Sequence, residues 1–188
     1  MKKTNVMLAM SGGIDSSVAL LLLKEEGWNI SGVTFRVWDY ISEACWEKQT
    51  GCCSIESIME ARQFAENHGV EHNIYDYREG FRSTVVNYFI NEYLEGRTPN
   101  PCVLCNRTVK WGVLLDYAES KGCSYIATGH YAQVREENGR FILSKGADDY
   151  KDQSYFLWML NQHQLSKTIF PAGKFHKPEI KAMAAKLG

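Results

Sequence analysis

The sequence has 188 residues, of which 45% are hydrophobic and 23% charged, and its formal net charge is −1. A chain of this length can bury one sizeable hydrophobic core, which excludes intrinsic disorder and fibrous structure. No apolar run approaches the roughly 18 residues that a membrane span requires, and the apolar stretch at the start is too short for a signal peptide. We therefore expect a cytoplasmic protein whose six cysteines are reduced, buried, metal-binding or catalytic, and not a disulfide framework.

The charges are distributed unevenly along the chain. Residues 1–100 carry 9 Lys and Arg against 14 Asp and Glu, whereas residues 101–188 carry 12 against 8. The first part therefore has a net charge of −5 and the second a net charge of +4. Because a basic part can hold a polyanion even when the whole molecule is nearly neutral, a nucleic-acid partner remains compatible with the composition.

Apolar runs punctuated by glycines predict alternating strands and helices in the first part of the chain. In chain order these are a strand at 5–10, a helix at 16–26, a strand at 30–37, an irregular loop at 38–53, a helix at 54–68, a strand at 71–77 and a helix at 81–93. The aromatic residues of the last helix recur at near-helical spacing, which predicts a face packed in the core.

The second part continues the alternation. We expect a loop at 96–106, a helix at 109–120, a strand at 124–128, a hairpin at 133–144 centred on Asn138-Gly139, a helix at 153–160 and a helix at 178–187. Asn-Gly between two strand-like runs is the strongest short-range hairpin signal. The whole pattern predicts an α/β protein with a doubly wound, mainly parallel sheet, and a β-hairpin and helices toward the C-terminal end.

A glycine-rich turn joins the first predicted strand to the first predicted helix. It reads Ser11-Gly12-Gly13-Ile14-Asp15-Ser16-Ser17. Glycines let the backbone approach an anion closely, hydroxyls add donors, and the helix N-terminus faces the same point with free amides and a positive dipole. The combination is typical of a phosphate site, although Ser and Asp are also ordinary helix caps. The sequence contains neither a Walker motif nor a dinucleotide-binding fingerprint.

Two cysteines separated by two residues form the second motif. Cys102 and Cys105 precede a predicted helix and lie close in sequence to Arg97, Arg107 and Lys110. A helix N-terminus and neighbouring cations favour the thiolate form of a cysteine, so a thiolate nucleophile is one interpretation. A zinc site is the other, but it needs a second cysteine pair, and the remaining cysteines do not repeat the spacing. These are Cys45, Cys52, Cys53 and Cys123.

The two motifs together resemble a known family. The loop SGGIDSS at 11–17 resembles the PP-loop of ATP pyrophosphatases, which cleave ATP between its α and β phosphates and leave AMP on a substrate oxygen. With GRTPNPCVLCN at 96–106, the chain resembles the tRNA-specific 2-thiouridylase (MnmA) family. The resemblance continues in GVTF at 32–35, ATGHY at 127–131 and KDQSYFL at 151–157.

This resemblance implies a two-step reaction that uses ATP and Mg²⁺. ATP adenylates O2 of a tRNA wobble uridine, and a persulfide on the nucleophile Cys105 then delivers sulfur to C2 while AMP leaves. The implied partners are a tRNA of the Lys, Glu or Gln type and a protein that donates or carries the persulfide sulfur. ATP would contact Ala9, Met10, Ser11, Gly12, Gly13, Ile14, Asp15, Ser16, Phe35 and Gly129, with Mg²⁺ near Asp15. The target base and the tRNA would contact Asn100, Pro101, Cys102, His130, Lys151, Asp152 and Gln153.

The chain departs from the family in two respects. Cys102 stands where many members have Asp, so it could be a second sulfur acceptor, a disulfide partner for Cys105, or an iron–sulfur ligand together with Cys105. The second catalytic cysteine of the family, its small central domain and its C-terminal barrel would all follow Gly188. We therefore expect residues 1–188 to be the PP-loop domain of a longer protein, with residues from about 150 leading toward a tRNA-binding domain, and not fully active alone.

Two other functions stay open at this point. Another PP-loop ligase or amidotransferase would share the loop but would not need the cysteine pair. A nucleotide- and tRNA-binding fragment would bind ATP without forming 2-thiouridine.

The other cysteines, histidines and tryptophans are interpreted as structural. We expect Cys123 to be buried, and Cys52 and Cys53 to cap or pack a helix. We expect the following histidines to be exposed to solvent: His68, His72, His163 and His176. We expect the following tryptophans to lie in the core: Trp38, Trp46, Trp111 and Trp158.

Overall fold

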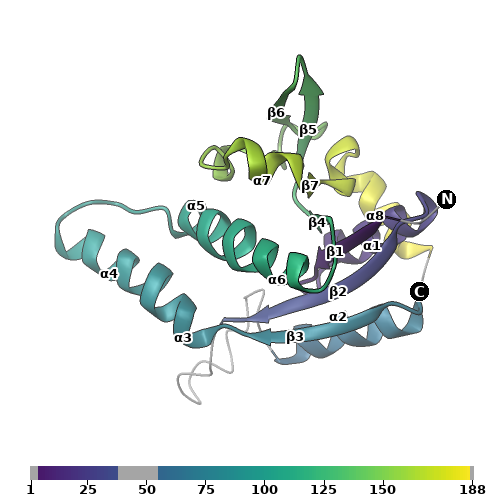
Figure 1. The fold of residues 1–188 in the computed structure, drawn as a ribbon, viewed down its shortest axis with the longest axis horizontal. Coiled ribbons are helices and arrows are strands. Elements are labelled where there is room, and N and C mark those ends of the chain that lie inside the picture. The colour runs from purple at the N-terminus through teal and green to yellow at the C-terminus, as the bar shows by residue number, and fades with distance from the viewer. Residues whose placement is uncertain (1–3, 38–54, 187–188) are drawn as a thin grey trace.

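The computed structural model describes residues 4–37 and 55–186, and its main element is a five-stranded parallel sheet (Figure 1). The strands are β1 (Asn5–Ala9), β2 (Asn29–Arg36), β3 (Glu71–Asp76), β4 (Tyr125–Thr128) and β7 (Thr168–Ile169). Their order is β3-β2-β1-β4-β7, so the chain winds in one direction from β1 to β3 and in the other from β1 to β7. Ligands bind such sheets at the carboxyl ends of the strands where the direction reverses, which here are β1 and β4.

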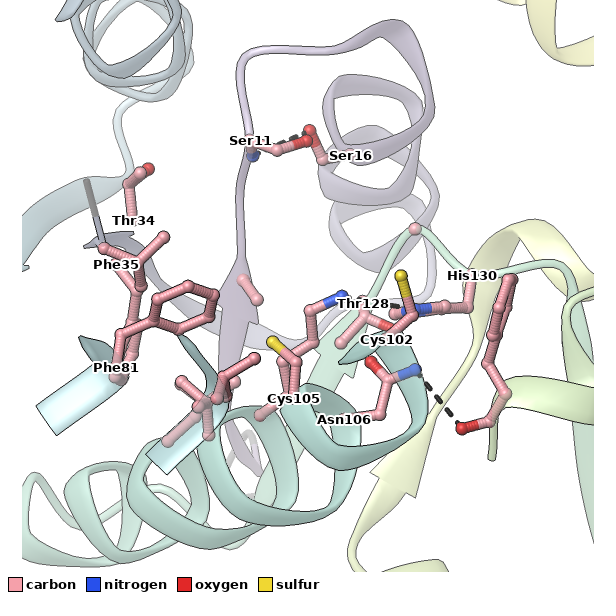
Figure 2. Close-up of a pocket in the computed structure, with 18 of the residues that line it drawn as sticks. Ser11, Ser16, Thr34, Phe35, Phe81, Cys102, Cys105, Asn106, Thr128 and His130 are labelled. Atoms are coloured by element: carbon pink, nitrogen blue, oxygen red, sulfur yellow. Dashed lines mark hydrogen bonds between the residues drawn. The ribbon is translucent and has the colours of Figure 1, made fainter. Parts of the chain in front are cut away.

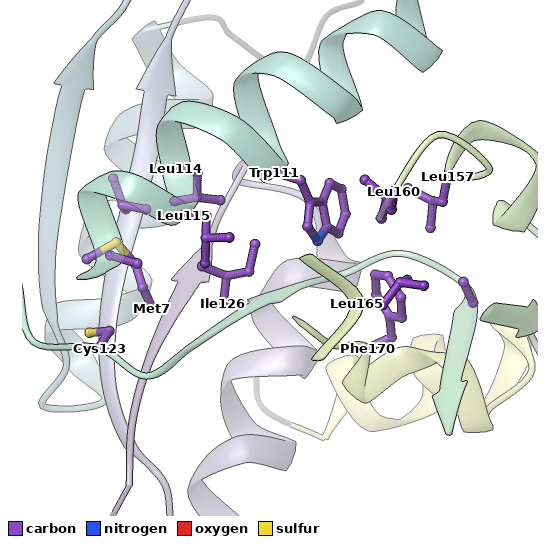
Figure 3. Packing of buried hydrophobic residues seen from close by; sticks show 13 residues of the cluster. Met7, Trp111, Leu114, Leu115, Cys123, Ile126, Leu157, Leu160, Leu165 and Phe170 are labelled. Carbon is purple, nitrogen blue, oxygen red and sulfur yellow. The ribbon is translucent and has the colours of Figure 1, made fainter. Parts of the chain in front are cut away.

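Both faces of the sheet are covered, as a doubly wound fold requires. Side chains alternate between the faces of a strand. Val6 and Leu8 of β1 pack with Leu20 in a cluster that includes residues of α1 (Ile14–Glu25) and α2 (Ile55–Asn67). Met7 points to the other face, where it belongs to the cluster around Trp111 (Figure 3). The predicted fold class is confirmed.

One continuous helix from Pro101 to Ser120 covers that second face. It consists of α5 (Pro101–Cys105), a π-helical segment η3 (Asn106–Val113) and α6 (Leu114–Ser120). The sequence predicted a loop up to residue 106, which was wrong. The side chain of Asn100 accepts a hydrogen bond from the Cys102 amide (3.1 Å), and proline suits the first helical position because its missing N–H needs no partner there. Cys102 and Cys105 therefore lie within the helix.

A second long helix leads away from the sheet (Figure 1). It comprises α3 (Arg78–Phe81), a π-helical segment η2 (Arg82–Val86) and α4 (Asn87–Leu94). Val85 is buried, but the predicted core position of the whole apolar face was wrong, because Tyr93 is 54% and Leu94 79% exposed. The periodicity identifies an apolar face but not what covers it, and part of this face lines a cavity described below.

The hairpin was predicted at the right place. Strands β5 (Ala132–Glu137) and β6 (Arg140–Lys145) pair around Asn138 and Gly139, which both have positive φ angles, 52° and 75°. The predicted helix at 153–160 was wrong, since only the 3₁₀ turn η4 (Ser154–Phe156) forms. Hydrogen bonds there join residues three apart, and successive tight turns bury both Leu157 and Leu160 in the core.

The remaining C-terminal elements are short. The sequence did not predict α7 (Gln162–Ser166) or β7, which are followed by the 3₁₀ turn η5 (Pro171–Lys174). The last predicted helix corresponds to α8 (Lys177–Ala185). Within the described ranges, no helix is long and apolar enough to cross a membrane.

Several predictions about single residues can be compared with the structure. Cys123 and Trp111 are buried as predicted, whereas Trp158 is 68% exposed, because it follows the tight turn at η4 and not a continuous helix. His163 and His176 are exposed, but His72 is buried, contrary to prediction. The predicted loop at 38–53, with the predictions for its cysteines and tryptophans, lies outside the described residues.

Candidate nucleotide and thiol site

A cavity of about 690 Å³ lies at the carboxyl ends of β1 and β4. Its wall includes Ser11, Asp15 and Ser16 of the glycine-rich loop together with Cys102 and Cys105 of the helix that begins at α5. Figure 2 shows the two cysteines across the cavity from Ser11 and Ser16. The volume is typical of a small-molecule site. The fold thus brings the two sequence motifs to one cavity.

The glycine-rich loop is held in a conformation that only glycine allows. Gly12 has a φ angle of +77°, and a Cβ atom there would lie 2.3 Å from the carbonyl oxygen of Ser57. The Ser16 hydroxyl donates to the Gly13 carbonyl oxygen (2.9 Å) and accepts from the Ser11 amide (3.3 Å). Gly13 is the N-cap of α1 and has no side chain to cap it, so an anion can take that place.

Asp15 links this loop to two distant parts of the chain. Its Oδ1 accepts from the Tyr131 hydroxyl (2.6 Å) and from Lys177 Nζ (2.5 Å). Burial, and next the hydrogen bond to Asp15, raise the pKa of Tyr131, so the phenol remains a donor. Lys177 is the first residue of α8, and nothing in the sequence pattern singled it out. The carboxylate is therefore already engaged by one cation on one of its oxygens.

The end of β4 packs directly on the first turn of α1. A Cβ atom on Gly129 would lie 3.0 Å from the Asp15 carbonyl carbon and from the Ser16 nitrogen, a tight contact that favours glycine at this position. The next residue, His130, lies in the cavity wall and packs against Trp111. The contact between the end of the strand and the start of the helix forms the part of the cavity wall next to the glycine-rich loop.

The hydrogen bonds of His130 define its protonation. Its Nε2 lies 3.3 Å from Lys110 Nζ, and its Nδ1 lies 2.8 Å from Thr128 Oγ1. Because an ammonium group only donates, Nε2 accepts and the ring hydrogen is on Nδ1. Burial, and next the charge of Lys110, lower the pKa of His130 well below its ordinary value. The imidazole is therefore neutral.

The two cysteines of the cavity are thiols. Among the described residues, Cys102, Cys105 and Cys123 form no disulfide. Cys102 is exposed and Cys105 half-buried, whereas burial raises the pKa of Cys123 in the core. Within residues 4–37 and 55–186, no group of three or more His, Cys, Asp or Glu side chains is arranged to hold a metal ion.

The residues predicted to contact RNA fall into two groups. Pro101, Cys102, His130 and Gln153 line the cavity, whereas Asn100 caps α5. Asp152 accepts hydrogen bonds from the Gly146 and Ser154 amides, and the Lys151 side chain is exposed. Gln153 bonds Tyr131 twice, through its backbone amide (2.9 Å) and through Oε1 (3.0 Å). The 146–154 segment is thus a fixed loop next to the cavity.

The predicted ATP contacts also fall into two groups. Six of them line the cavity: Ala9, Met10, Ser11, Asp15, Ser16 and Phe35. Gly129 lines the cavity as well. Gly12, Gly13 and Ile14 are not among the lining residues and lie where the turn enters α1. Sequence reasoning predicted no ligand contact for the other polar lining residues, namely Thr34, Asn106, Lys110 and Thr128. Lys110 was noted only as a cation near the cysteine pair, whereas Thr128 and Thr34 carried no signal apart from the motifs around them.

Comparisons with known proteins identify the family of the chain. Residues 4–188 match the family described as tRNA methyl transferase HUP domain. The chain belongs to this family. The HUP domain is 55% identical over 187 residues to a protein of Cytophaga hutchinsonii named tRNA-specific 2-thiouridylase MnmA, covering all of this chain and 51% of that protein. It is 54% identical to the Amoebophilus asiaticus protein of the same name, covering 50% of it. The chain therefore spans about half the length of these curated relatives.

Solved structures show the same fold. A 4-thiouridine synthetase, solved as an RNA complex with bound ATP, has a TM-score of 0.60 and 21% identity, covering 98% of this chain and 41% of that one. A predicted subunit of a tRNA methyltransferase from Methanocaldococcus jannaschii has a TM-score of 0.58 and 17% identity, covering 97% and 74%. At this identity the likeness concerns the fold alone.

Proposed function

We propose that the HUP domain belongs to an enzyme that converts a tRNA wobble uridine to 2-thiouridine at the expense of ATP. The observation that carries the proposal is the shared cavity, which the phosphate-type loop and two thiols line together. A nucleotide site alone would need the loop but not Cys102 and Cys105. The names of the relatives that match the whole chain support the same function.

The first step activates the base. O2 of the uridine attacks the α-phosphorus of ATP, the bond to the β-phosphate breaks, and pyrophosphate leaves. The loop at 11–17 and the N-terminus of α1 would hold the phosphates, and the backbone near Phe35 and Gly129 the adenosine. Mg²⁺ bound to ATP would neutralise phosphate charge, and Asp15 can offer it one carboxylate oxygen, since the described donors occupy only Oδ1.

The second step delivers sulfur. The terminal sulfur of a Cys105 persulfide attacks C2, and AMP leaves with the original oxygen. A second thiol then attacks Sγ of Cys105, which releases 2-thiouridine and leaves a disulfide to be reduced by an external thiol. Cys102 lines the same cavity and can supply this thiol. The persulfide sulfur itself would come from a donor protein.

The RNA would contact mainly residues of the basic part of the chain, 101–188. A base can reach the cavity only if it leaves its stack, which is cheaper in an anticodon loop than in a duplex. We place the RNA contacts on Asn100, Pro101 and Cys102, on His130, and on the loop segment Lys151, Asp152 and Gln153. The reaction needs reduced thiols and tRNA together, which assigns it to the cytoplasm.

The test is formation of 2-thiouridine by the purified enzyme to which we propose that the HUP domain belongs. Protein loaded with persulfide is incubated with ATP, Mg²⁺ and unmodified tRNA, and the digested nucleosides are measured by mass spectrometry. We expect a Cys105→Ser variant to lose the product while still releasing pyrophosphate, because adenylation does not need the thiol.

Cys123→Ala is the matched control, because it removes a cysteine outside the cavity. It should form product like the unaltered protein once folding is verified. Full product formation by Cys105→Ser would contradict the proposed role of the thiol. Pyrophosphate release without any thiolated base, even in the unaltered protein, would favour another PP-loop ligase function, whereas ATP binding without pyrophosphate release would favour a binding function.

A further inference from the structure

Lys110 is a cation in the wall of the cavity. It lies in η3, five residues after Cys105, and both side chains line the cavity. Within the described ranges, its Nζ makes no ion pair with Asp or Glu; its hydrogen-bond partner is His130 Nε2, at 3.3 Å. Cations in partly buried places are ordinarily paired, so a cation held by a neutral group is available for an anion that enters.

The environment of His130 keeps this arrangement in place. Thr128 Oγ1 accepts from Nδ1, which leaves Nε2 as the acceptor that holds the ammonium group. Because burial lowers the pKa of the imidazole, the ring does not become a second cation that would repel Lys110. Trp111 and Phe170 pack against the ring and fix its position.

The position of the ammonium group identifies the anion. His130 follows Gly129, which packs on the Asp15–Ser16 backbone at the phosphate-type loop. Lys110 itself extends from the helix that carries Cys105. It therefore lies between the loop, where pyrophosphate would leave, and the thiol, where C2 of the base would lie. In the proposed reaction, the group that passes between these two places is the α-phosphoryl group.

We propose that Lys110 binds the α-phosphoryl oxygens of the nucleotide, first in ATP and then in the adenylated base, with neutral His130 as its positioning residue. The inference rests on the proposed function and deepens it. One cation would serve both steps, since the α-phosphoryl group is the electrophile in the first and part of the leaving AMP in the second. Asp15, already paired with Lys177, would not compete for Lys110.

Binding of AMP and of adenosine to the protein tests the proposal, because the two probes differ only in the phosphate. We expect Lys110→Met to weaken AMP binding by about 10- to 100-fold, the range for hydrogen bonds to a charged group, and to leave adenosine binding unchanged. Lys110→Arg, which keeps the charge, should recover part of the loss. Lys181→Met removes an exposed lysine of α8 and serves as the control, with both affinities unchanged.

Three results would overturn the inference. An equal loss for AMP and adenosine would show that Lys110 only supports the fold of the cavity. Unchanged AMP binding, with iodoacetamide alkylation of Cys105 shifted to higher pH, would show that the cation serves the thiolate. If the unaltered protein bound neither probe, the ATP-dependent function itself would fail, and this inference with it.

Discussion

The imidazole of His72 forms a hydrogen bond with Thr34, a residue of the cavity wall. Thr34 Oγ1 donates to the Met10 carbonyl oxygen (2.8 Å), so it must accept from His72 Nε2 (2.9 Å). Within the described residues the buried Nδ1 has no hydrogen-bond partner, and burial lowers the pKa of the ring. The sequence analysis predicted that His72 is solvated, because the residue that covers its ring is distant in sequence. The ring packs on Gly32, which belongs to the neighbouring strand β2.

We expect the protein to lose stability as the pH falls below about 6.5, the pKa of histidine in an unfolded chain. Burial lowers the pKa of His72 in the folded protein, so the unfolded chain binds a proton at higher pH. The contribution of His72 to stability is therefore complete above about pH 6.5 and is lost as the pH falls toward the folded pKa. The variant His72→Gln keeps a donor for Thr34 but cannot titrate. Its free energy of unfolding in urea should therefore fall less between pH about 8 and about 5.

The exposed His163 supplies the control for this experiment. His163→Gln should follow the pH dependence of the unaltered protein, because this side chain is exposed and lies outside the hydrogen bonds of His72 and Thr34. If His72→Gln lost as much stability as the unaltered protein, the buried neutral imidazole would not be the cause.

At the scale of elements, α8 connects the glycine-rich loop to the 146–154 segment. Its buried Ile180 packs in a cluster with Val18 of α1. The Lys177 side chain binds Asp15 in the glycine-rich loop, and its backbone amide donates to Asp148 Oδ2 (2.8 Å). That hydrogen bond is the largest cause that lowers the pKa of Asp148, which in turn caps the loop carrying the proposed RNA contacts. A single residue thus joins the nucleotide loop to the 146–154 segment.

We expect Lys177→Met to lower the free energy of unfolding by about 1–2 kcal/mol, because the partly buried Asp15 carboxylate loses a charged donor. Lys174→Met, an exposed residue nearby, should cost almost nothing. Adding Asp15→Asn to each variant completes a double-mutant cycle in urea unfolding. Additive effects of Lys177→Met and Asp15→Asn would show that the pair is not energetically coupled.

Elements whose signals are local could be predicted from the sequence, and elements defined by distant partners could not. The turn that follows β1 contains Gly12, and the hairpin contains Gly139. Both glycines have the positive φ angle that the backbone of each turn requires. The two-residue β7 exists only because β4 pairs with it. The start of α5 was missed because a proline in the first helical turn has the same sequence signature as a proline in a loop.

At the scale of the whole molecule, the cavity lies where the two differently charged parts of the sequence meet. Ser11, Asp15 and Phe35 come from the acidic part, and Cys105 and Lys110 from the basic part. The motifs could be predicted, since each is continuous in sequence. Their common cavity, and the pairing of Lys110 with His130, depend on packing between β4 and the helix at 101–120, which no local pattern records.

We expect tRNA affinity to fall with salt, because lysines of the basic part release counterions from phosphates. Lys151 has an exposed side chain on a fixed backbone. Replacing it with Met should reduce the slope of log affinity against log salt by about 0.7–0.9, the value for one phosphate contact. Arg62→Met on α2, in the acidic part, should leave the slope unchanged. An unchanged slope for Lys151→Met would place the RNA elsewhere.

The ion pair between Asp15 and Lys177 joins residues 162 positions apart. A ribosome makes the chain from its N-terminus, so the glycine-rich loop emerges long before the lysine that neutralises it. The β4 residues that complete the cavity wall also emerge late. We therefore expect a nascent chain to lack an assembled nucleotide site until α8 has been synthesised, and to bind ATP only after that point.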